Sequence, residues 1–217
     1  MVLNQPTHQC PLCQGQDLHP IAGHHPRPYW RCGHCWLVHL DPAAFLTPEG
    51  EKAVYDGHDN SDNPQYRQFL EKLSKPILEK ISYNYKGLDF GSGPNPVLQA
   101  LFKEAGFDID VYDKFYAADE KVWQSSYDFI TASEVVEHLH RPRETLDRLW
   151  GVLRPNGWFG VMSGRWLDEA RFKTWRYTHD PTHVCFFHEK TCRWLADQWQ
   201  AKLGIISPTV FLLQKPA

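Results

Sequence analysis

Residues 87–96 read Gly-Leu-Asp-Phe-Gly-Ser-Gly-Pro-Asn-Pro and carry the strongest structural signal in the chain. Residues 88–90 predict a short buried strand. Gly91 and Gly93 then let the backbone turn sharply and approach a ligand, because no Cβ stands in the way. A helix is expected to open at Pro96, since proline suits the first helical turn. Strand, glycine-rich turn and helix together predict a nucleotide-binding element.

A second strand is predicted downstream, at residues 108–113, and it ends in the carboxylate of Asp113. Asp113 follows Gly91 at about the spacing at which an acidic side chain meets ribose hydroxyls. The third glycine of a dinucleotide fingerprint is missing, because Pro96 stands near its place. This difference argues against a pyrophosphate ligand.

Two further motifs follow in order. Residues 127–139 read Tyr-Asp-Phe-Ile-Thr-Ala-Ser-Glu-Val-Val-Glu-His-Leu, and residues 153–158 read Leu-Arg-Pro-Asn-Gly-Trp. With the first two motifs they resemble class I S-adenosylmethionine-dependent methyltransferases over about residues 87–163, and four motifs in order are more specific than one. The resemblance implies an α/β fold with a doubly wound, Rossmann-like sheet, and S-adenosylmethionine as cofactor.

The resemblance also implies which residues hold that cofactor. Gly91 and Gly93 would lie under its methionine part, and Asp113 would hold its ribose. Glu134 would lie at the mouth of the site, near the methyl group. The expected cofactor site is completed by Asp89, Ser92 and Trp123.

The chain departs from the family pattern between Asp113 and Tyr127. Residues 114–126 are too few for a crossover helix and a full third strand, so that strand is expected to be short or absent. The family takes its adenine contacts from the end of the third strand. Trp123 or residues 117–119 would have to serve instead, and the alternative for Trp123 is that it fills the gap left by the missing helix.

Four of the six cysteines form two pairs, Cys10-Pro-Leu-Cys13 and Cys32-Gly-His-Cys35. The length of the spacer between the pairs, residues 14–31, is typical of a zinc ribbon, in which two tight turns place four thiolates around one Zn²⁺. We therefore expect a structural zinc site in a ribbon domain of residues 1–40. Four thiolate ligands leave no open position for catalysis. A metal that only stabilises this short segment is therefore favoured over a module that docks a substrate or partner.

Composition limits the possible partners and the location of the protein. The net charge is −3 and the pI about 6.4, which gives no general attraction to nucleic acid, although a local basic patch stays an alternative. The sequence shows neither a long apolar run nor a charged-then-apolar leader, so we expect no membrane partner and a cytoplasmic location.

Residues 41–63 are rich in Pro, Gly, Asp and Asn and predict a linker between the ribbon and a methyltransferase domain of residues 64–217. In class I methyltransferases the region before the first strand often folds over the cofactor. The resemblance therefore makes His58 and Asn60 candidates for a substrate-contacting lid. The alternative is a solvated loop with a helix cap at its end.

Residues 127–133 predict a buried strand, and the chain turns out of its carboxyl end, where ligands gather in open α/β sheets. We expect the mouth of the site there, with His138 positioning substrate. The alternative for His138 is a bond to a nearby loop carbonyl. Further on, residues 156–157, Asn-Gly, predict a turn before a strand at residues 158–162.

Residues 175–184 read Trp-Arg-Tyr-Thr-His-Asp-Pro-Thr-His-Val, and Asp-Pro makes a continuous helix unfavourable there. Some glycan- and small-molecule-modifying members of the family carry a similar Asp-Pro-Thr-His-Val segment, so the resemblance points to such an acceptor. A histidine suits a general base near neutral pH, and we expect His183 or His179 in that role with Asp180 orienting it. The alternatives are a surface turn with a capping aspartate and a second metal site. The expected acceptor contacts here are Arg176 and Tyr177.

The sequence alone leaves three functions open. The leading one is a methyltransferase that acts on a small molecule or glycan. The second keeps the chemistry but takes RNA or protein as acceptor, with the ribbon as docking module, and the third is a catalytically inert binding protein with the same fold. The sequence does not specify the acceptor, the methylated atom or the oligomeric state.

Overall fold

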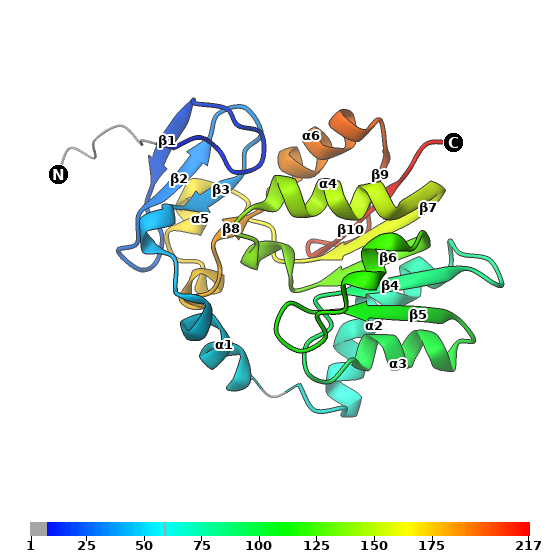
Figure 1. The fold of residues 1–217 in the computed structure, drawn as a ribbon. Helices are drawn as coiled ribbons and strands as arrows, with labels where there is room; N and C mark the ends of the chain where they lie inside the picture. The colour runs from blue at the N-terminus through cyan, green and yellow to red at the C-terminus, as the bar shows by residue number, and fades with distance from the viewer. Residues whose placement is uncertain (1–7, 59) are drawn as a thin grey trace.

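The computed structural model describes residues 8–58 and 60–217 and contains two β-sheets, one larger and one smaller (Figure 1). The strands are β1 (Leu18–Ile21), β2 (Tyr29–Cys32), β3 (Val38–Leu40), β4 (Lys86–Phe90), β5 (Asp108–Tyr112), β6 (Tyr127–Ser133), β7 (Leu153–Met162), β8 (Cys185–Phe186), β9 (Lys202–Ile205) and β10 (Val210–Gln214). The α-helices are α1 (Pro48–Asp56), α2 (Pro64–Leu78), α3 (Val97–Glu104), α4 (Pro142–Val152), α5 (Glu169–Phe172) and α6 (Glu189–Trp199).

The larger sheet has the order β5-β4-β6-β7-β10-β9. Strands β5, β4, β6 and β7 run parallel, whereas β10 pairs antiparallel with both β7 and β9. The chain moves outward from β4 to β5 and then returns to the other side of β4 with β6. The carboxyl ends of β4 and β6 therefore border the point where the strand order reverses, which is where open α/β sheets bind ligands. The predicted doubly wound fold is confirmed.

Helices cover both faces of this sheet (Figure 1). On one face, α2 and α3 pack together, and the buried side chains of Leu73, Ile77 and Phe102 share one apolar cluster with Phe129 of β6. On the other face, α4 and α6 bury Leu149 and other side chains in a second apolar cluster. Burial of each amphipathic face supplies most of the stability of such short helices.

The third strand is absent among the described residues that follow β5, as the short spacing predicted. A 3₁₀ helix, η2 (Glu120–Gln124), takes its place. Its Trp123 packs edge-on against the rings of Phe90 and Tyr112, at centroid distances of 6.0 and 5.0 Å. Trp123 thus fills the space beside the edge strand, which is the alternative that the sequence left open.

The smaller sheet has the order β1-β2-β3-β8, and its fourth strand comes from the opposite end of the sequence. Strand β8 pairs with β3 through Val38–Phe186 and His39–Cys185. The buried side chains of this sheet belong to the same apolar cluster as those under α4 and α6. The N-terminal module is therefore built into the rest of the protein; residues 1–7 of the expected ribbon domain lie outside the described part of the chain.

Two local features were not expected from the sequence. The segment at residues 41–63 is not only a linker, because it contains α1, which Thr47 caps by accepting the N–H of Gly50 at 3.2 Å. The expected turn at residues 156–157 lies inside β7. Asn156 there has a φ of 64°, and the pairing with β6 shifts register nearby, so the strand bulges instead of beginning anew.

Candidate active site

The glycine-rich turn follows β4 directly and has the left-handed backbone that favours glycine. Gly91 and Gly93 have φ values of 77° and 67°. A Cβ added to Gly91 would overlap the side chain of Val135, whereas one added to Gly93 would meet only Asn60 Nδ2, at 3.9 Å. The turn therefore presents bare backbone to an open space on its Gly93 side.

The carboxylate of Asp113 bonds to three backbone amides around that space. Asp113 Oδ2 accepts the N–H of Gly93 at 3.0 Å, and Oδ1 accepts those of Phe115 and Tyr116 at 2.8 and 3.2 Å. A carboxylate has about four lone-pair positions, so about one remains for a ligand. Asp113 thus ties the end of β5 to the glycine-rich turn and still has an acceptor site for a ribose hydroxyl.

A cavity of about 640 Å³ lies at the carboxyl ends of β4, β5 and β6. It collects ten of the residues predicted for the site, from stretches far apart in the sequence. They are His58, Asn60, Gly91, Ser92, Gly93, Asp113, Glu134, His138, Asp180 and His183.

Five predicted residues do not line the cavity. Asp89 is buried behind the turn, where the Thr131 hydroxyl donates to Oδ1 at 2.9 Å and where burial raises the pKa of its carboxyl to about 7. Trp123 packs against Phe90 and Tyr112, which do line the cavity. The others are Tyr177, which lies beneath Glu134, and the side chains of Arg176 and His179.

Aromatic side chains that the sequence analysis overlooked line the cavity instead. Phe115 and Tyr116 follow Asp113 directly, and Tyr55 of α1 lies 5.8 Å from the Phe115 ring. Tyr116 also donates its hydroxyl to Asp56 Oδ1 at 2.7 Å, which connects α1 to the loop after β5. The sequence signal for them is the two consecutive aromatic residues that follow Asp113 directly.

At the other end of the cavity, the Tyr177 hydroxyl lies between two carboxylates. It is 3.0 Å from Glu134 Oε2, it hydrogen-bonds Glu137 Oε1 closely, and it accepts the N–H of Gly164 at 3.2 Å. Glu137 is fully buried. Burial raises the pKa of both carboxyl groups, and the charge of Glu134 raises that of Glu137 further. Both groups therefore tend to keep a proton in this poorly solvated part of the site.

Two histidines lie beside these carboxylates with their rings 4.7 Å apart. His138 Nδ1 is 3.2 Å from the carbonyl oxygen of Thr182, and His183 Nδ1 is 2.6 Å from that of Tyr177. A carbonyl oxygen only accepts, so Nδ1 carries the proton in each ring and Nε2 keeps its lone pair. Burial lowers the pKa of His138 to about 3 and also lowers that of His183, so both imidazoles are neutral at pH 7.

Asp180 lies next to His183, as the sequence suggested, but its hydrogen bonds go elsewhere. Its Oδ2 is 3.9 Å from His183 Nε2 and 3.8 Å from His58 Nε2, while Oδ1 accepts the N–H of Thr182 at 2.8 Å. Asp180 therefore shapes the loop first and contacts the imidazoles only loosely. His179 points to solvent, where its ring stacks on His24 at a centroid distance of 4.1 Å.

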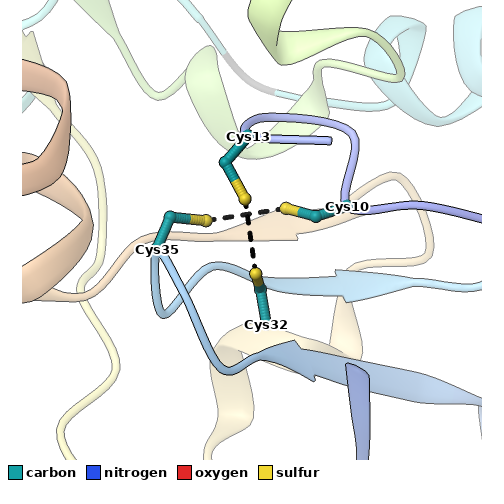
Figure 2. Close-up of side chains that lie close together, drawn as sticks. All are labelled: Cys10, Cys13, Cys32 and Cys35. Carbon is teal, nitrogen blue, oxygen red and sulfur yellow. Dashed lines mark hydrogen bonds between the residues drawn. The ribbon is translucent and has the colours of Figure 1, made fainter. Parts of the chain in front are cut away.

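The four paired cysteines converge from two loops of the N-terminal module (Figure 2). The Sγ atoms of Cys10 and Cys35 are 3.5 Å apart and those of Cys13 and Cys32 are 3.4 Å apart, and all four lie within 4.8 Å of one another. A tetrahedral zinc ion with bonds of about 2.3 Å needs sulfur atoms about 3.8 Å apart, so this donor set fits the ion.

In the part of the chain that the structure describes, no helix combines the length and apolar character needed to cross a bilayer.

Residues 59–203 match a family model described as a methyltransferase domain. No curated protein matches the sequence at a significant level.

Solved structures share the fold at low sequence identity. A SAM-dependent methyltransferase from Archaeoglobus fulgidus is 15% identical with a TM-score of 0.52, covering 69% of this chain and 94% of that one. The plantazolicin methyltransferase BpumL, in complex with a pentazolic desmethylPZN analog and SAH, is 15% identical with a TM-score of 0.50, covering 78% and 92%. Haemonchus contortus phosphoethanolamine N-methyltransferase 2, in complex with S-adenosyl-L-methionine, is 11% identical with a TM-score of 0.53, covering 79% and 58%.

Proposed function

Because the chain belongs to the methyltransferase domain family, and is thus an S-adenosylmethionine-dependent methyltransferase, we propose that it methylates a hydroxyl group of a small molecule or glycan. One observation carries the proposal. The glycine-rich turn and Asp113 line the same cavity as His138, Asp180 and His183. Cofactor groups and acceptor-binding groups thus face one shared space.

The cofactor end of the cavity fits S-adenosylmethionine. Bare backbone at Gly93 leaves room for the methionine part, and the remaining acceptor position of Asp113 suits a ribose hydroxyl. We assign the adenine contacts to Phe115 and Tyr116, whose rings border this end, in place of Trp123. When bound, the cofactor supplies an electrophilic methyl group on its sulfonium.

The acceptor end supports a neutral, hydroxylated acceptor. Methyl transfer needs in-line alignment, and a hydroxyl must also lose its proton. His138 and His183 lie there as neutral imidazoles whose Nε2 atoms keep a lone pair, so either can accept a hydrogen bond or a proton from the acceptor. Glu134 borders the same end, closer to the glycine-rich turn.

The size of the cavity supports a small acceptor over a polymer. At about 640 Å³ it is in the range of small-molecule sites, and Tyr55, Gly57 and His58 line it from the end of α1. Two of the structurally similar enzymes are named as methyltransferases of plantazolicin and of phosphoethanolamine. We favour a small molecule or a short glycan over RNA or protein. The methyl-transfer experiment described below distinguishes these acceptors.

We further propose that the four cysteines hold a structural Zn²⁺ and that the protein acts in the cytoplasm. The tetrahedral fit of the sulfur atoms supports the first. For the second, none of the six cysteines forms a disulfide, as a reducing compartment favours.

Calorimetric titration with S-adenosylmethionine and S-adenosylhomocysteine tests the cofactor, with NAD as control. We expect dissociation constants in the micromolar range for the first two and no binding of NAD. Transfer of a labelled methyl group to pools of small hydroxyl compounds, glycans, RNA and protein then tests the acceptor class. Binding without transfer to any pool would favour the inert binding protein, and label in RNA or protein would refute a small acceptor.

A further inference from the structure

We propose that Glu137, His138 and His183 bind a divalent cation, and that the acceptor hydroxyl coordinates this cation during methyl transfer. The second half of the proposal rests on the proposed function; the first half stands on the geometry alone. One ligand atom from each of the three side chains lies within 4.8 Å of the others. The three residues come from two segments, the turn after β6 and the loop before β8, that the fold brings together.

Glu137 supplies the observation that points to a ligand. Its side chain has no exposed surface, and its Oε1 is taken by the Tyr177 hydroxyl. Its Oε2 is buried and has no hydrogen-bond partner. A buried carboxylate oxygen without a partner is costly, and a cation bound at Oε2 would remove that cost.

The histidines are oriented as metal ligands usually are. Metal-binding imidazoles donate their second ring N–H to a carbonyl or carboxylate, which holds the ring and leaves the other nitrogen for the metal. Both His138 and His183 bond a backbone carbonyl through Nδ1. Each carbonyl belongs to the segment from Tyr177 to Thr182, so one loop orients both rings.

The charge of the site also favours a cation. The carboxyl groups of Glu134 and Glu137 both contact the Tyr177 hydroxyl, so two acidic groups share a poorly solvated part of the site. Two such carboxylates repel each other unless a proton or a cation lies with them. A divalent cation would neutralise both. We expect Glu134, which lines the cavity, to become the fourth protein ligand.

The donor set indicates the kind of cation. Imidazole nitrogen with carboxylate oxygen suits Mn²⁺, Co²⁺ or Fe²⁺ better than a soft, thiolate-preferring ion. Bonds of about 2.1 Å require neighbouring ligand atoms about 3 Å apart, so the side chains must draw in by roughly 1 to 2 Å on binding. Because the site borders the cavity, coordination positions remain for an acceptor.

Such a cation would act on the acceptor hydroxyl in two ways. It would hold the oxygen beside the methyl group, and it would lower the pKa of the hydroxyl as it does for bound water. The hydroxyl proton passes to water, the oxygen forms a bond to the methyl carbon, and the carbon–sulfur bond breaks to leave S-adenosylhomocysteine. His183 is then a ligand and not a general base.

The test measures Mn²⁺ binding to the full chain by electron paramagnetic resonance and calorimetry, with zinc content determined in parallel. We expect one Mn²⁺ per chain in the wild type, and binding at least 10-fold weaker in Glu137→Gln and His183→Gln. The control His19→Gln changes an exposed histidine that belongs to no cluster of possible metal ligands and should bind Mn²⁺ like the wild type. Unchanged zinc content in all variants would separate this site from the cysteine cluster.

Mn²⁺ binding that is absent, or that is the same in the wild type and in both variants, would overturn the proposal. The two variants lie on different segments, so a folding defect in one, seen in its circular dichroism, leaves the other as the test. S-adenosylmethionine titrations of the same samples keep the two proposals apart. Cofactor binding without Mn²⁺ binding would refute the metal site only, whereas Mn²⁺ binding without cofactor binding would refute the proposed function.

Discussion

The buried carboxylate of Glu51 in α1 forms an ion pair with the ammonium of Lys114, at 2.6 Å, in the loop that follows Asp113. Glu51 Oε1 is also 2.7 Å from His140 Nε2. Although burial opposes ionisation, these partners lower the pKa of Glu51, so the charge is retained. The helix that precedes His58 and Asn60 is thereby attached to the cofactor end of the cavity.

Glu51→Gln should loosen that attachment. We expect a loss of about 1–3 kcal/mol in the free energy of unfolding, because a hydrogen-bonded charge is removed. S-adenosylmethionine should bind more weakly, since Tyr55 and Asn60 lose their support. Denaturant unfolding and calorimetry measure the two effects. Glu49→Gln, on the exposed side of the same helix, is the control, and equal behaviour of the two variants would contradict the role of Glu51.

Gly91→Ala should destabilise the protein by more than backbone strain alone. An alanine there has an unfavourable φ, at a cost of about 1–2 kcal/mol, and also overlaps Val135. Gly106→Ala is the matched control, because Gly106 has a φ of 89° and no atom within 4 Å of an added Cβ. Urea unfolding of both variants separates strain from overlap. A loss at Gly91 no larger than at Gly106 would show that Val135 can move aside.

Asp113→Ala should weaken S-adenosylmethionine binding about 10-fold or more, which corresponds to about 1.4 kcal/mol. The structure adds a stability cost, because three backbone amides lose their acceptor. We expect the unfolding free energy to fall by about 1–3 kcal/mol. Calorimetry and urea unfolding measure the two effects, with Asp108→Ala, at the exposed start of β5, as control. Unchanged affinity would remove Asp113 from the cofactor site.

Cys10→Ser should release zinc and loosen more than the N-terminal module itself. Strand β8 completes the ribbon sheet and follows His183 closely, so loss of the metal should increase hydrogen exchange at residues 183–187 as well. Metal analysis and exchange mass spectrometry give the result. Cys192→Ser changes a buried cysteine outside the cluster and should keep its zinc. Retention of zinc by Cys10→Ser would disprove the ligand assignment.

Asp89→Asn should change how stability depends on pH. The pKa of Asp89 is about 7 in the folded protein, against an ordinary value of 3.8. The folded state therefore keeps this proton up to a higher pH than the unfolded state does. The stability that this proton contributes is fully present below pH 3.8 and is lost as pH rises toward 7. The asparagine variant lacks this loss, so its stability relative to the wild type should rise over the same interval. Urea unfolding across that interval, with Asp108→Asn at an exposed position as control, gives the comparison; parallel curves for Asp89→Asn and the wild type would contradict the raised pKa.

Local sequence signals were sufficient wherever neighbouring residues make the structure. Residues 87–96 specify a strand, a left-handed glycine turn and a helix through backbone preferences alone, and the structure has them in that order. The absent third strand followed from chain length, because residues 114–126 cannot hold both a helix and a strand. The cysteine pairs likewise indicated a convergence of thiols, which the structure contains.

The cavity's composition required the tertiary structure. The sequence left open whether Trp123 or residues 117–119 contact adenine, or whether Trp123 only fills a gap. In the structure Trp123 packs against Phe90 and Tyr112, and Phe115 and Tyr116 line the cavity. The composition of residues 41–63 likewise did not predict α1, because it is typical of a loop. The helix is supported by the cap at Thr47 and by the ion pair of Glu51.

By itself, then, the sequence determined the fold, the cofactor turn and the cysteine cluster, because each depends on preferences and spacings within a short segment. Only the tertiary structure decided which histidine enters the site. His179 and His183 are equivalent on one short loop, yet a turn sends one to solvent and the other beside Glu137 and His138. Burial and partners are set by segments distant along the chain, and they alone separate a surface imidazole from one that lines the cavity.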